Sequence, residues 1–345
     1  MIRFYCDYSQ SAHPSILKAI SAHPDAQYPG YGEDKHCKHA AKLIQDACKA
    51  PDSDVHFLVG GTQANTTIIS AILRPHQGVL SADTGHIATH ETGAIEATGH
   101  KVLTLPAENG KITAEQIASA YDDHWADEAH EHLPQPALVY LSHPTEMGTV
   151  YTLDELEAIS SVCKKRNLPL MLDGARLGYG LASPFTTITL ADVARLCDVF
   201  YIGGTKMGTL FGEAVVIAND AIKRDFRYLI KRHGGLLAKG FLLGMQFATM
   251  FEDDLYYQLG KHGVTEAMHL RQGLLDAGFT LQYDTGTNQQ FPVLSEDVKA
   301  KLSEHFTFAN WEKLDKKHSV VRFCTSWATK REDVDKLIFA LNKDR

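Results

Sequence analysis

A lysine and an aspartate, each following an apolar run, have complementary chemistry. Lys206 lies among small residues shortly after Val199-Phe-Tyr-Ile, and Asp173 ends the run Leu168-Pro-Leu-Met-Leu. Crowding strips a lysine of water, which disfavours the ammonium and leaves an amine able to form a Schiff base. Pyridoxal phosphate needs such an amine for its aldehyde and a carboxylate for its pyridinium nitrogen. The pair therefore predicts a pyridoxal-phosphate site.

A glycine-rich turn could bind the phosphate of that cofactor. Gly60-Gly61-Thr62 follows the apolar run His56-Phe-Leu-Val and opens a helical stretch. Glycines permit close approach of an anion, and the first amides of a helix bind phosphate. An ordinary strand-to-helix turn would use the same residues. Because ligands bind at the carboxyl ends of parallel strands, we expect Gly61, Asp173 and Lys206 to converge.

Histidines supply further candidate groups. His86 lies in the polar stretch 83–91, where an imidazole could stack on an aromatic cofactor or move protons, although a lone histidine is more often structural. Two other groups, 36–39 and 124–132, contain metal-type ligands. We expect both groups to be surface features and predict no metal site.

Two arginines are candidates for binding anions. Arg176, three residues after Asp173, could pair with that aspartate, a phosphate or a substrate carboxylate, or could form an ordinary surface ion pair. Arg322 interrupts the apolar stretch Val320–Cys324, as expected of a side chain that binds a carboxylate with two hydrogen bonds. Period-two alternation leaves solvent exposure of Arg322 as the alternative.

Composition excludes several classes of protein. The formal net charge of −8 argues against a nucleic-acid binder, and no apolar run approaches the length that spans a bilayer. Hydrophobic residues make up 44% and charged residues 22%, as in ordinary globular proteins. The six cysteines are scattered, without the spacing of a disulfide framework or metal site. We expect a cytoplasmic protein with free thiols.

The order of apolar and helical stretches predicts an α/β fold with two domains. Short apolar runs alternate with helical patterns between about residues 55 and 217, which favours a mainly parallel, seven-stranded sheet covered on both faces. One helix is expected to begin at Thr152, which forms a capping box with Glu155. A long helix should run from about 241 past 257, followed by strands near 279–283, 290–294 and 319–324 and a closing helix from 332. We place a large domain at 1–240 and a smaller α+β domain at 241–345.

Together these segments resemble the threonine aldolase and aromatic amino acid β-eliminating lyase family, a fold type I group of pyridoxal-phosphate enzymes. The resemblance covers nearly the whole chain and rests on these segments: Ser11-Ala-His-Pro, Tyr31-Gly-Glu-Asp, Gly61-Thr-Gln-Ala-Asn, His86, Glu91-Thr-Gly, Pro144-Thr-Glu-Met-Gly-Thr-Val-Tyr, Asp173-Gly-Ala-Arg, Gly204-Thr-Lys and Arg322-Phe-Cys-Thr-Ser. It implies a transferase-like large domain and a homodimer or homotetramer with shared active sites.

The resemblance also implies roles for particular residues. Lys206 would bind the cofactor aldehyde, Asp173 the pyridine nitrogen, and His86 would stack on the ring. The other implied cofactor contacts are Gly61, Thr62, Arg176 and Thr205. Arg176, Arg322 and Tyr31 would contact the substrate, Tyr31 from a neighbouring subunit. Glu146 stands where many threonine aldolases carry a second histidine, near the substrate hydroxyl.

The implied reaction is retro-aldol cleavage of a β-hydroxy-α-amino acid, such as L-threonine, L-allo-threonine or phenylserine, to glycine and an aldehyde. Either Glu146 or a water held by His86 would take the hydroxyl proton. The alternative within the cofactor class is β-elimination to pyruvate and ammonia. A dinucleotide-binding oxidoreductase is disfavoured, because G-x-G-x-x-G is absent after the first strand. A cofactor-free binding protein with a snorkelling Lys206 is the remaining alternative.

Overall fold

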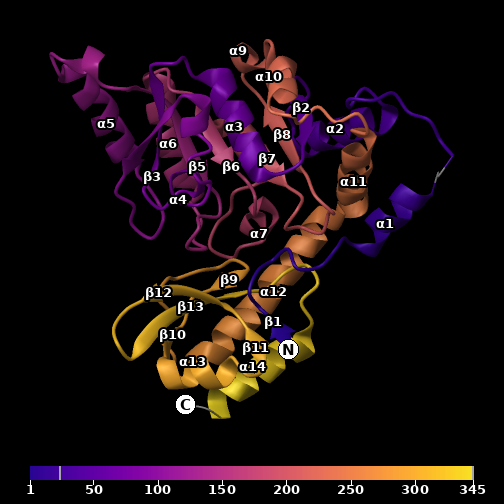
Figure 1. Cartoon of the computed structure of the whole chain (residues 1–345), viewed down its shortest axis with the longest axis vertical. Coiled ribbons are helices and arrows are strands. Elements are labelled where there is room, and N and C mark those ends of the chain that lie inside the picture. Colours follow the sequence, from indigo (N-terminus) through magenta and orange to yellow (C-terminus); the bar gives the residue numbers. More distant parts are fainter. Residues whose placement is uncertain (23–24, 344–345) are drawn as a thin grey trace.

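A seven-stranded sheet forms the centre of the larger part of the molecule (Figure 1). The computed structural model describes residues 1–22 and 25–343. The strand order is β2-β8-β7-β6-β5-β3-β4. The strands are β2 (Asp54–Leu58), β3 (Gln77–Ala82), β4 (Lys101–Leu105), β5 (Gln135–Ser142), β6 (Leu170–Asp173), β7 (Val199–Gly203) and β8 (Glu213–Ile217). Each apolar run expected between residues 55 and 217 forms one strand.

Strand β8 is the antiparallel member of the sheet. It runs opposite to both of its neighbours, β7 and β2, whereas β3, β4, β5, β6 and β7 are parallel to one another. A parallel pair needs a crossover of a dozen or more residues, and the connection 204–212 between β7 and β8 is too short for one. That short connection carries Lys206.

Helices cover both faces of the sheet, because successive side chains of each strand point to opposite faces. Leu80 and Leu141 pack in one apolar core, and their neighbours Val79 and Tyr140 pack in the other. The first face is covered by α1 (Pro14–Ser21), α2 (Lys35–Cys48), α5 (Ala114–Ala126), α6 (Leu153–Lys165), α7 (Leu177–Leu181), α8 (Leu190–Leu196) and α11 (Phe241–Phe251). The second is covered by α3 (Gly61–Ile72), α4 (His86–Thr89), α9 (Asp220–Lys223) and α10 (Phe226–Arg232).

Local sequence signals set the start of several of these helices. Thr152 caps α6 and forms the expected capping box with Glu155. Thr113 and Thr189 cap α5 and α8 in the same way. Each box satisfies backbone N–H groups that have no partner within the helix. Short 3₁₀ turns occur at Glu96–Thr98, His130–His132 and Glu252–Asp254.

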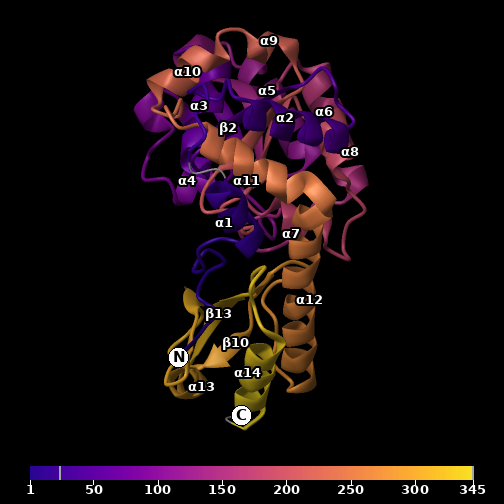
Figure 2. The same ribbon diagram turned by 90° about the vertical axis from the view of Figure 1, so that its right-hand side faces the viewer.

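A smaller unit lies beside the carboxyl ends of the strands and contains both chain ends (Figures 1 and 2). Its antiparallel sheet consists of β9 (Gln289–Gln290), β10 (Val293–Ser295), β12 (Ala309–Lys313) and β13 (His318–Cys324). Helices α12 (Leu255–Asp276), α13 (Glu296–Leu302) and α14 (Arg331–Lys343) pack with it. Strand β1 (Ile2–Arg3) pairs with β11 (Phe306–Thr307), so the N-terminal strand lies in this unit.

The structure corrects three expected elements. The long helix is broken between α11 and α12, where Asp253 and Asp254 have φ values of 52° and 57°. Aspartate tolerates this left-handed conformation, which turns the chain from the sheet toward the smaller unit (Figure 2). The expected strand at 279–283 makes only an isolated bridge between Leu281 and Pro292, and the segment 290–294 is divided between β9 and β10.

The division at residue 240 stays a prediction, but the packing around it is clear. Helix α11, just after that point, packs against α2 of the larger unit, and α12 continues into the smaller unit. Phe4, near the start of the chain, packs in the core of the smaller unit. Within residues 1–22 and 25–343, no helix is long and apolar enough to cross a membrane.

Candidate active site

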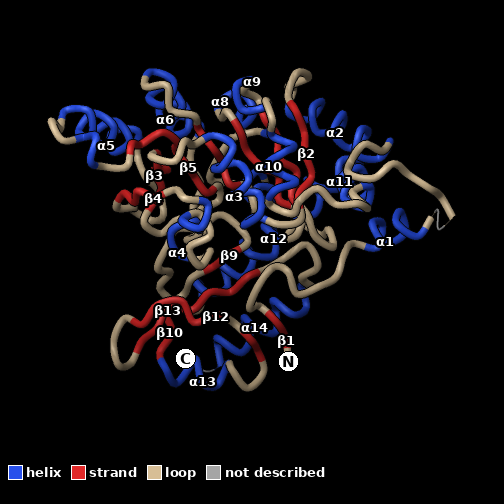
Figure 3. The backbone as a smooth tube through the Cα atoms, turned by 45° about the horizontal axis from the view of Figure 1, so that its top comes forward, coloured by secondary structure: helices blue, strands red, loops and turns tan. Residues whose placement is uncertain are grey.

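At one edge of the seven-stranded sheet, whose strands are red in Figure 3, lie the carboxyl ends of five strands that lead to candidate residues. Strands β2 and β7 both run antiparallel to β8, so they point the same way, and β3, β5 and β6 are parallel to β7. The first candidate residues at or after these strand ends are Gly61, His86, Glu146, Asp173 and Lys206. The expected convergence of separate sequence segments is therefore present.

Asp173 is the best-connected carboxylate at this edge. It is buried, and its oxygens accept hydrogen bonds from the Tyr140 hydroxyl at 2.5 Å, Asn65 Nδ2 at 3.3 Å and the Ala175 N–H at 3.0 Å. Burial by itself would raise the pKa of Asp173, but the positive charge of His86 and the hydroxyl donors outweigh it and lower the pKa. The carboxylate is thus kept ionised without exposure to water.

His86 is held by a second buried carboxylate. Its Nδ1 donates to Glu91 Oε1 at 2.8 Å, and Asn65 Nδ2 donates to the same oxygen at 2.7 Å. Burial disfavours the imidazolium, yet the hydrogen bond to Glu91 and the charge of Asp173 outweigh burial and raise the pKa of His86. Asn65 therefore links the two carboxylates that orient and charge this ring.

Glu146 lies next to His86 with one oxygen bonded and one free. Oε1 accepts from the backbone N–H of His86 at 2.9 Å and from Ser142 Oγ at 2.6 Å. Oε2 is buried and has no hydrogen-bond partner. Burial and the nearby charge of Asp173 raise the pKa of Glu146, although the Ser142 hydroxyl opposes the change. A carboxylate with a raised pKa and a free oxygen is suited to accept a proton.

Lys206 lies in the turn between β7 and β8, where the Tyr179 hydroxyl donates to its carbonyl oxygen at 2.8 Å. Within the described ranges, no hydrogen bond or ion pair engages its Nζ. Burial lowers the pKa of Lys206, and the Arg176 guanidinium lowers it further. Carboxylates around the site oppose this shift, Asp7 and Asp173 most strongly. The amine is therefore available to a ligand.

Arg176 has a partner that the sequence did not reveal. Its Nε and NH2 atoms donate to the two oxygens of Asp7 at 2.6 and 3.1 Å, and Asn288 Nδ2 also donates to Asp7 at 2.9 Å. Burial would raise the pKa of Asp7, but Arg176 and Lys206 lower it to about 2. Arg176 is therefore paired neither with Asp173 nor with a surface residue, as the sequence had suggested, but with a buried aspartate.

Arg322 is half-buried rather than fully exposed. It donates to Gln289 Oε1 at 3.2 Å and to the Tyr5 carbonyl at 3.4 Å, and it lies 5.2 Å from the Trp311 ring centre. Its Nε is buried without a partner, which leaves a donor for an anion. Burial, His86 and then Arg322 lower the pKa of His90. The charge of Arg322 therefore reaches the same region as His86.

The glycine-rich turn and Thr205 have different environments. Gly61 begins α3, no side chain caps this helix, and Thr62 is exposed on its first turn. The first amides of α3 are therefore accessible to an anion. Thr205 is committed to protein contacts: its hydroxyl donates to Glu213 Oε1 at 3.0 Å and accepts from the Gly212 N–H at 3.0 Å.

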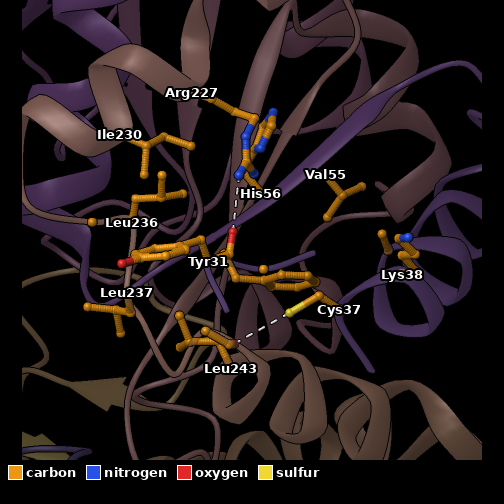
Figure 4. Close-up of a pocket in the computed structure, with 15 residues that line it drawn as sticks. Tyr31, Cys37, Lys38, Val55, His56, Arg227, Ile230, Leu236, Leu237 and Leu243 are labelled. Atoms are coloured by element: carbon orange, nitrogen blue, oxygen red, sulfur yellow. Dashed lines mark hydrogen bonds between the residues drawn. The ribbon is translucent and has the colours of Figure 1, made fainter. Parts of the chain in front are cut away.

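Tyr31 lies apart from these residues. It is exposed and borders a cavity of about 120 Å³ beside Val55, Arg227 and Leu237 (Figure 4). Its carbonyl accepts from Arg227 at 3.2 Å, and Lys231 Nζ lies 4.9 Å from the ring centre. Among the described contacts of Tyr31, none involves Lys206 or Asp173.

The two histidine-rich segments lie outside this region. His130 and His132 are in a short 3₁₀ turn after α5, where His130 packs against Trp125. His39, on α2, contacts Glu252. In the parts of the chain that the structure describes, no group of three or more metal-type side chains is placed to hold a metal ion.

Several residues of the site were not assigned from sequence. Asn65 carried a usable signal, because it follows Gly61 by four positions and so lies on the same side of α3. Tyr140 lies within the continuous apolar run of β5 and packs in one of the two cores, and nothing in the sequence marked its hydroxyl. Asp7 and Asn288 are far from Arg176 in sequence, and only the fold brings them together.

Comparison with known proteins gives a consistent result. A model of the family described as beta-eliminating lyase matches residues 16–297. A low specificity L-threonine aldolase of Pseudomonas aeruginosa is 32% identical over 97% of this chain and 95% of its own length. A solved structure of Leishmania major threonine aldolase superposes with a TM-score of 0.97 at 46% identity, covering 99% of both chains. An aspartate aminotransferase of Thermus thermophilus, at 13% identity and a TM-score of 0.72 over 100% of this chain and 92% of its own, shares the fold.

The ion pair between Asp7 and Arg176 predicts a specific pH dependence of stability. Asp7→Asn should lower the free energy of unfolding by about 3–5 kcal/mol at pH 7, because it leaves Arg176 buried and unpaired. The folded pKa of Asp7 is depressed to about 2, so its contribution is present above its unfolded pKa and lost as the pH falls. The difference between wild type and variant should therefore narrow from about pH 4 to about pH 2.

Denaturant unfolding at several pH values measures this difference. Glu157→Gln, which breaks the exposed pair with Arg195, is the matched control and should change stability by about 0.5 kcal/mol or less. Parallel pH curves for wild type and Asp7→Asn would contradict the assignment.

Proposed function

The chain belongs to the beta-eliminating lyase family, in its threonine aldolase branch, and we propose that the site at the strand ends cleaves β-hydroxy-α-amino acids with bound pyridoxal phosphate. The products are glycine and an aldehyde. The observation that carries this proposal is the unpartnered Nζ of Lys206 at the same sheet edge as the ionised, buried Asp173. Two buried atoms without partners, Glu146 Oε2 and Arg322 Nε, also fit a site built for a ligand.

The residues present suit the cofactor. Nζ of Lys206 would hold its aldehyde carbon, and Asp173 would keep a proton on its ring nitrogen. The accessible first amides of α3, at Gly61 and Thr62, would bind its phosphate. When bound, pyridoxal phosphate provides an acceptor for the electron pair released at the substrate Cα. Thr205 contributes by fixing the turn, since its hydroxyl is already bonded.

His86 acts as a fixed cation in this proposal. Glu91 bonds Nδ1 and sets the orientation of the ring, whose face would lie against the cofactor. Its raised pKa favours the imidazolium at neutral pH, so Nε2 is a donor that can hold a water or substrate oxygen. In the imidazolium form that this shift favours, His86 would hold that oxygen rather than remove a proton from it.

Arg322 would fix the substrate carboxylate. Its free Nε is a donor in an otherwise bonded guanidinium, while Arg176 is already bonded to both oxygens of Asp7. Arg176 would add positive charge to the same region without releasing Asp7. A carboxylate held in this way orients the substrate, so that the bond to be broken is the one between Cα and Cβ.

Glu146 would take the proton of the β-hydroxyl group. Its Oε2 has no partner, and Oε1 is fixed by Ser142 and by the His86 N–H. The raised pKa makes this carboxylate a stronger base than an exposed glutamate. Proton transfer to Oε2 and release of the aldehyde would then occur beside the fixed positive charge of His86.

Tyr31 would complete the site of a second copy of the chain. The residue is exposed and lines the cavity in Figure 4, and none of its described contacts in its own chain involves Lys206. An exposed aromatic residue beside an apolar depression is typical of subunit interfaces. We propose a homodimer or homotetramer in which Tyr31 reaches the substrate of a neighbouring subunit.

A product assay tests the reaction. Purified protein with added cofactor should release glycine and an aldehyde from L-threonine, L-allo-threonine or phenylserine. It should also show a visible absorbance that borohydride abolishes. Lys206→Ala should lose both, because no other amine occupies this turn.

The same assay separates the alternatives. Pyruvate and ammonia without aldehyde would indicate β-elimination. Wild-type protein with neither cofactor absorbance nor product would contradict the proposal.

Replacing Glu146 tests the proton acceptor. Glu146→Gln should lower kcat about 100-fold or more, with KM changed only a few-fold, because the amide keeps the shape and loses the base. The wild-type rate should rise with pH as Glu146 ionises, which gives the pH–rate profile an acid limb. The Glu146→Gln variant should lack this limb. Ser142→Ala removes a bond that lowers the pKa of Glu146, so it should shift the limb to higher pH. An unchanged limb in Glu146→Gln would assign the base elsewhere.

Mixing two inactive variants tests the shared site. Tyr31→Ala and Lys206→Ala chains, denatured together and refolded, should form hybrids in which one site has both an intact lysine and the partner's tyrosine. Random pairing into dimers should restore about one quarter of wild-type activity. Each variant refolded alone is the control. Activity equal to the sum of the parents would place Tyr31 in the site of its own chain, or nowhere in it.

A further inference from the structure

A further buried carboxylate lies beside the turn that carries Lys206. Glu213 is the first residue of β8 and is only 4% exposed. Its Oε1 accepts from Thr205 Oγ1 at 3.0 Å, and its Oε2 accepts from the Gly204 N–H at 3.3 Å. These donors are the two residues that precede Lys206. The Thr205 hydroxyl also accepts from the Gly212 N–H. The side chain of Glu213 and the Gly212 N–H together therefore hold the two ends of the turn 204–212 next to each other.

The charge of Glu213 is not needed for closing the turn. A neutral acceptor could bond one hydroxyl and one N–H, whereas a buried carboxylate costs several kcal/mol unless it is compensated. In the described part of the chain, no arginine or lysine forms an ion pair with Glu213. Burial raises its pKa to about 8, and the ammonium of Lys206 is the main charge that opposes this shift.

The groups facing this pair come from several elements. Glu213 is influenced by Asp173 of β6, and its own charge raises the pKa of Tyr201 of β7 and of Tyr256 of α12. Lys206 faces one cation, Arg176, and three carboxylates: Asp7, Asp173 and Glu213. Asp7 is held by Arg176, and Asp173 by hydroxyl and amide donors. Of the three, Glu213 has the pKa closest to neutral pH, so its charge is the one most easily changed.

We propose that Glu213 is a positioning residue for Lys206, which fixes the turn through Gly204 and Thr205 and sets the proton affinity of Nζ through its own charge. Ionised Glu213 stabilises the ammonium. When Glu213 is neutral, this stabilisation of the ammonium is lost, and the uncharged, nucleophilic amine of Lys206 is favoured. This inference deepens the proposed function and rests on Lys206 as the cofactor-binding residue.

Competitive acetylation of cofactor-free protein over a range of pH, read by mass spectrometry, measures the proton affinity of Lys206 directly. Glu213→Gln removes a negative charge, so the midpoint of Lys206 should fall by roughly half a pH unit to one unit. A shift of one unit corresponds to about a tenfold increase in the amine fraction below the midpoint. With cofactor bound, the midpoint of the visible absorbance should move in the same direction.

Matched variants separate charge from structure. Thr205→Val removes one hydrogen bond to Glu213 but leaves the Glu213 carboxylate in place. Thr205→Ser keeps a hydroxyl at this position and should restore wild-type behaviour. Glu266→Gln removes another buried carboxylate, bonded to Arg331 in the smaller unit, and should lower stability without moving Lys206. An unchanged Lys206 midpoint in folded Glu213→Gln would overturn the inference. If wild type shows no lysine-dependent absorbance, the proposed function fails instead, whatever the acetylation result.

Discussion

The arrangement of the site depends on keeping Asp173 ionised although water is excluded from it. Burial opposes that state, and the structure offsets it with donors from three directions: Tyr140 on β5, Asn65 on α3 and the Ala175 amide after β6. The positive charge of His86 adds to them. His86 in turn is charged because Glu91 and Asp173 lie beside it. Asp173 and His86 therefore stabilise each other's charged form.

The same edge carries more buried charge than a single catalytic pair requires. Lys206, Arg176 and His86 lie among Asp7, Asp173 and Glu213, and each pKa is displaced by its neighbours. In such a group the effect of removing one charge spreads to the others. The antiparallel course of β8 contributes here. It makes the connection after β7 short, and it brings Glu213 back to the turn from which Lys206 projects.

The part of this site that sequence could predict is the part encoded by local pattern. Lys206 and Asp173 were recognisable because each follows a continuous apolar run, and the seven runs correspond to the seven strands. His86 was a candidate from its residue type alone, and its role, like that of Glu146, came from resemblance to a family. Asp7 carries no local signal, since its importance arises from contact with Arg176, which lies 169 positions further along the chain. The break at Asp253 and Asp254 was missed because apolar helical periodicity continues on both sides of it. The turn of the backbone there depends on tertiary packing rather than on the local sequence.

The N-terminal segment shows how that long-range contact shapes the whole molecule. It begins in β1, which pairs with β11 of the smaller unit, and Phe4 packs in that unit's core. Three residues later, Asp7 bonds to Arg176 at the end of the large sheet and to Asn288 just before β9. Arg322, on β13, also bonds to this segment through the Tyr5 carbonyl. The proposed carboxylate clamp and the proposed cofactor lysine are thus carried by different units, and the short segment 4–7 connects them. Because Arg322 and Asn288 both belong to the smaller unit, a shift of that unit would alter the proposed carboxylate clamp and the hydrogen bonding of Asp7 together.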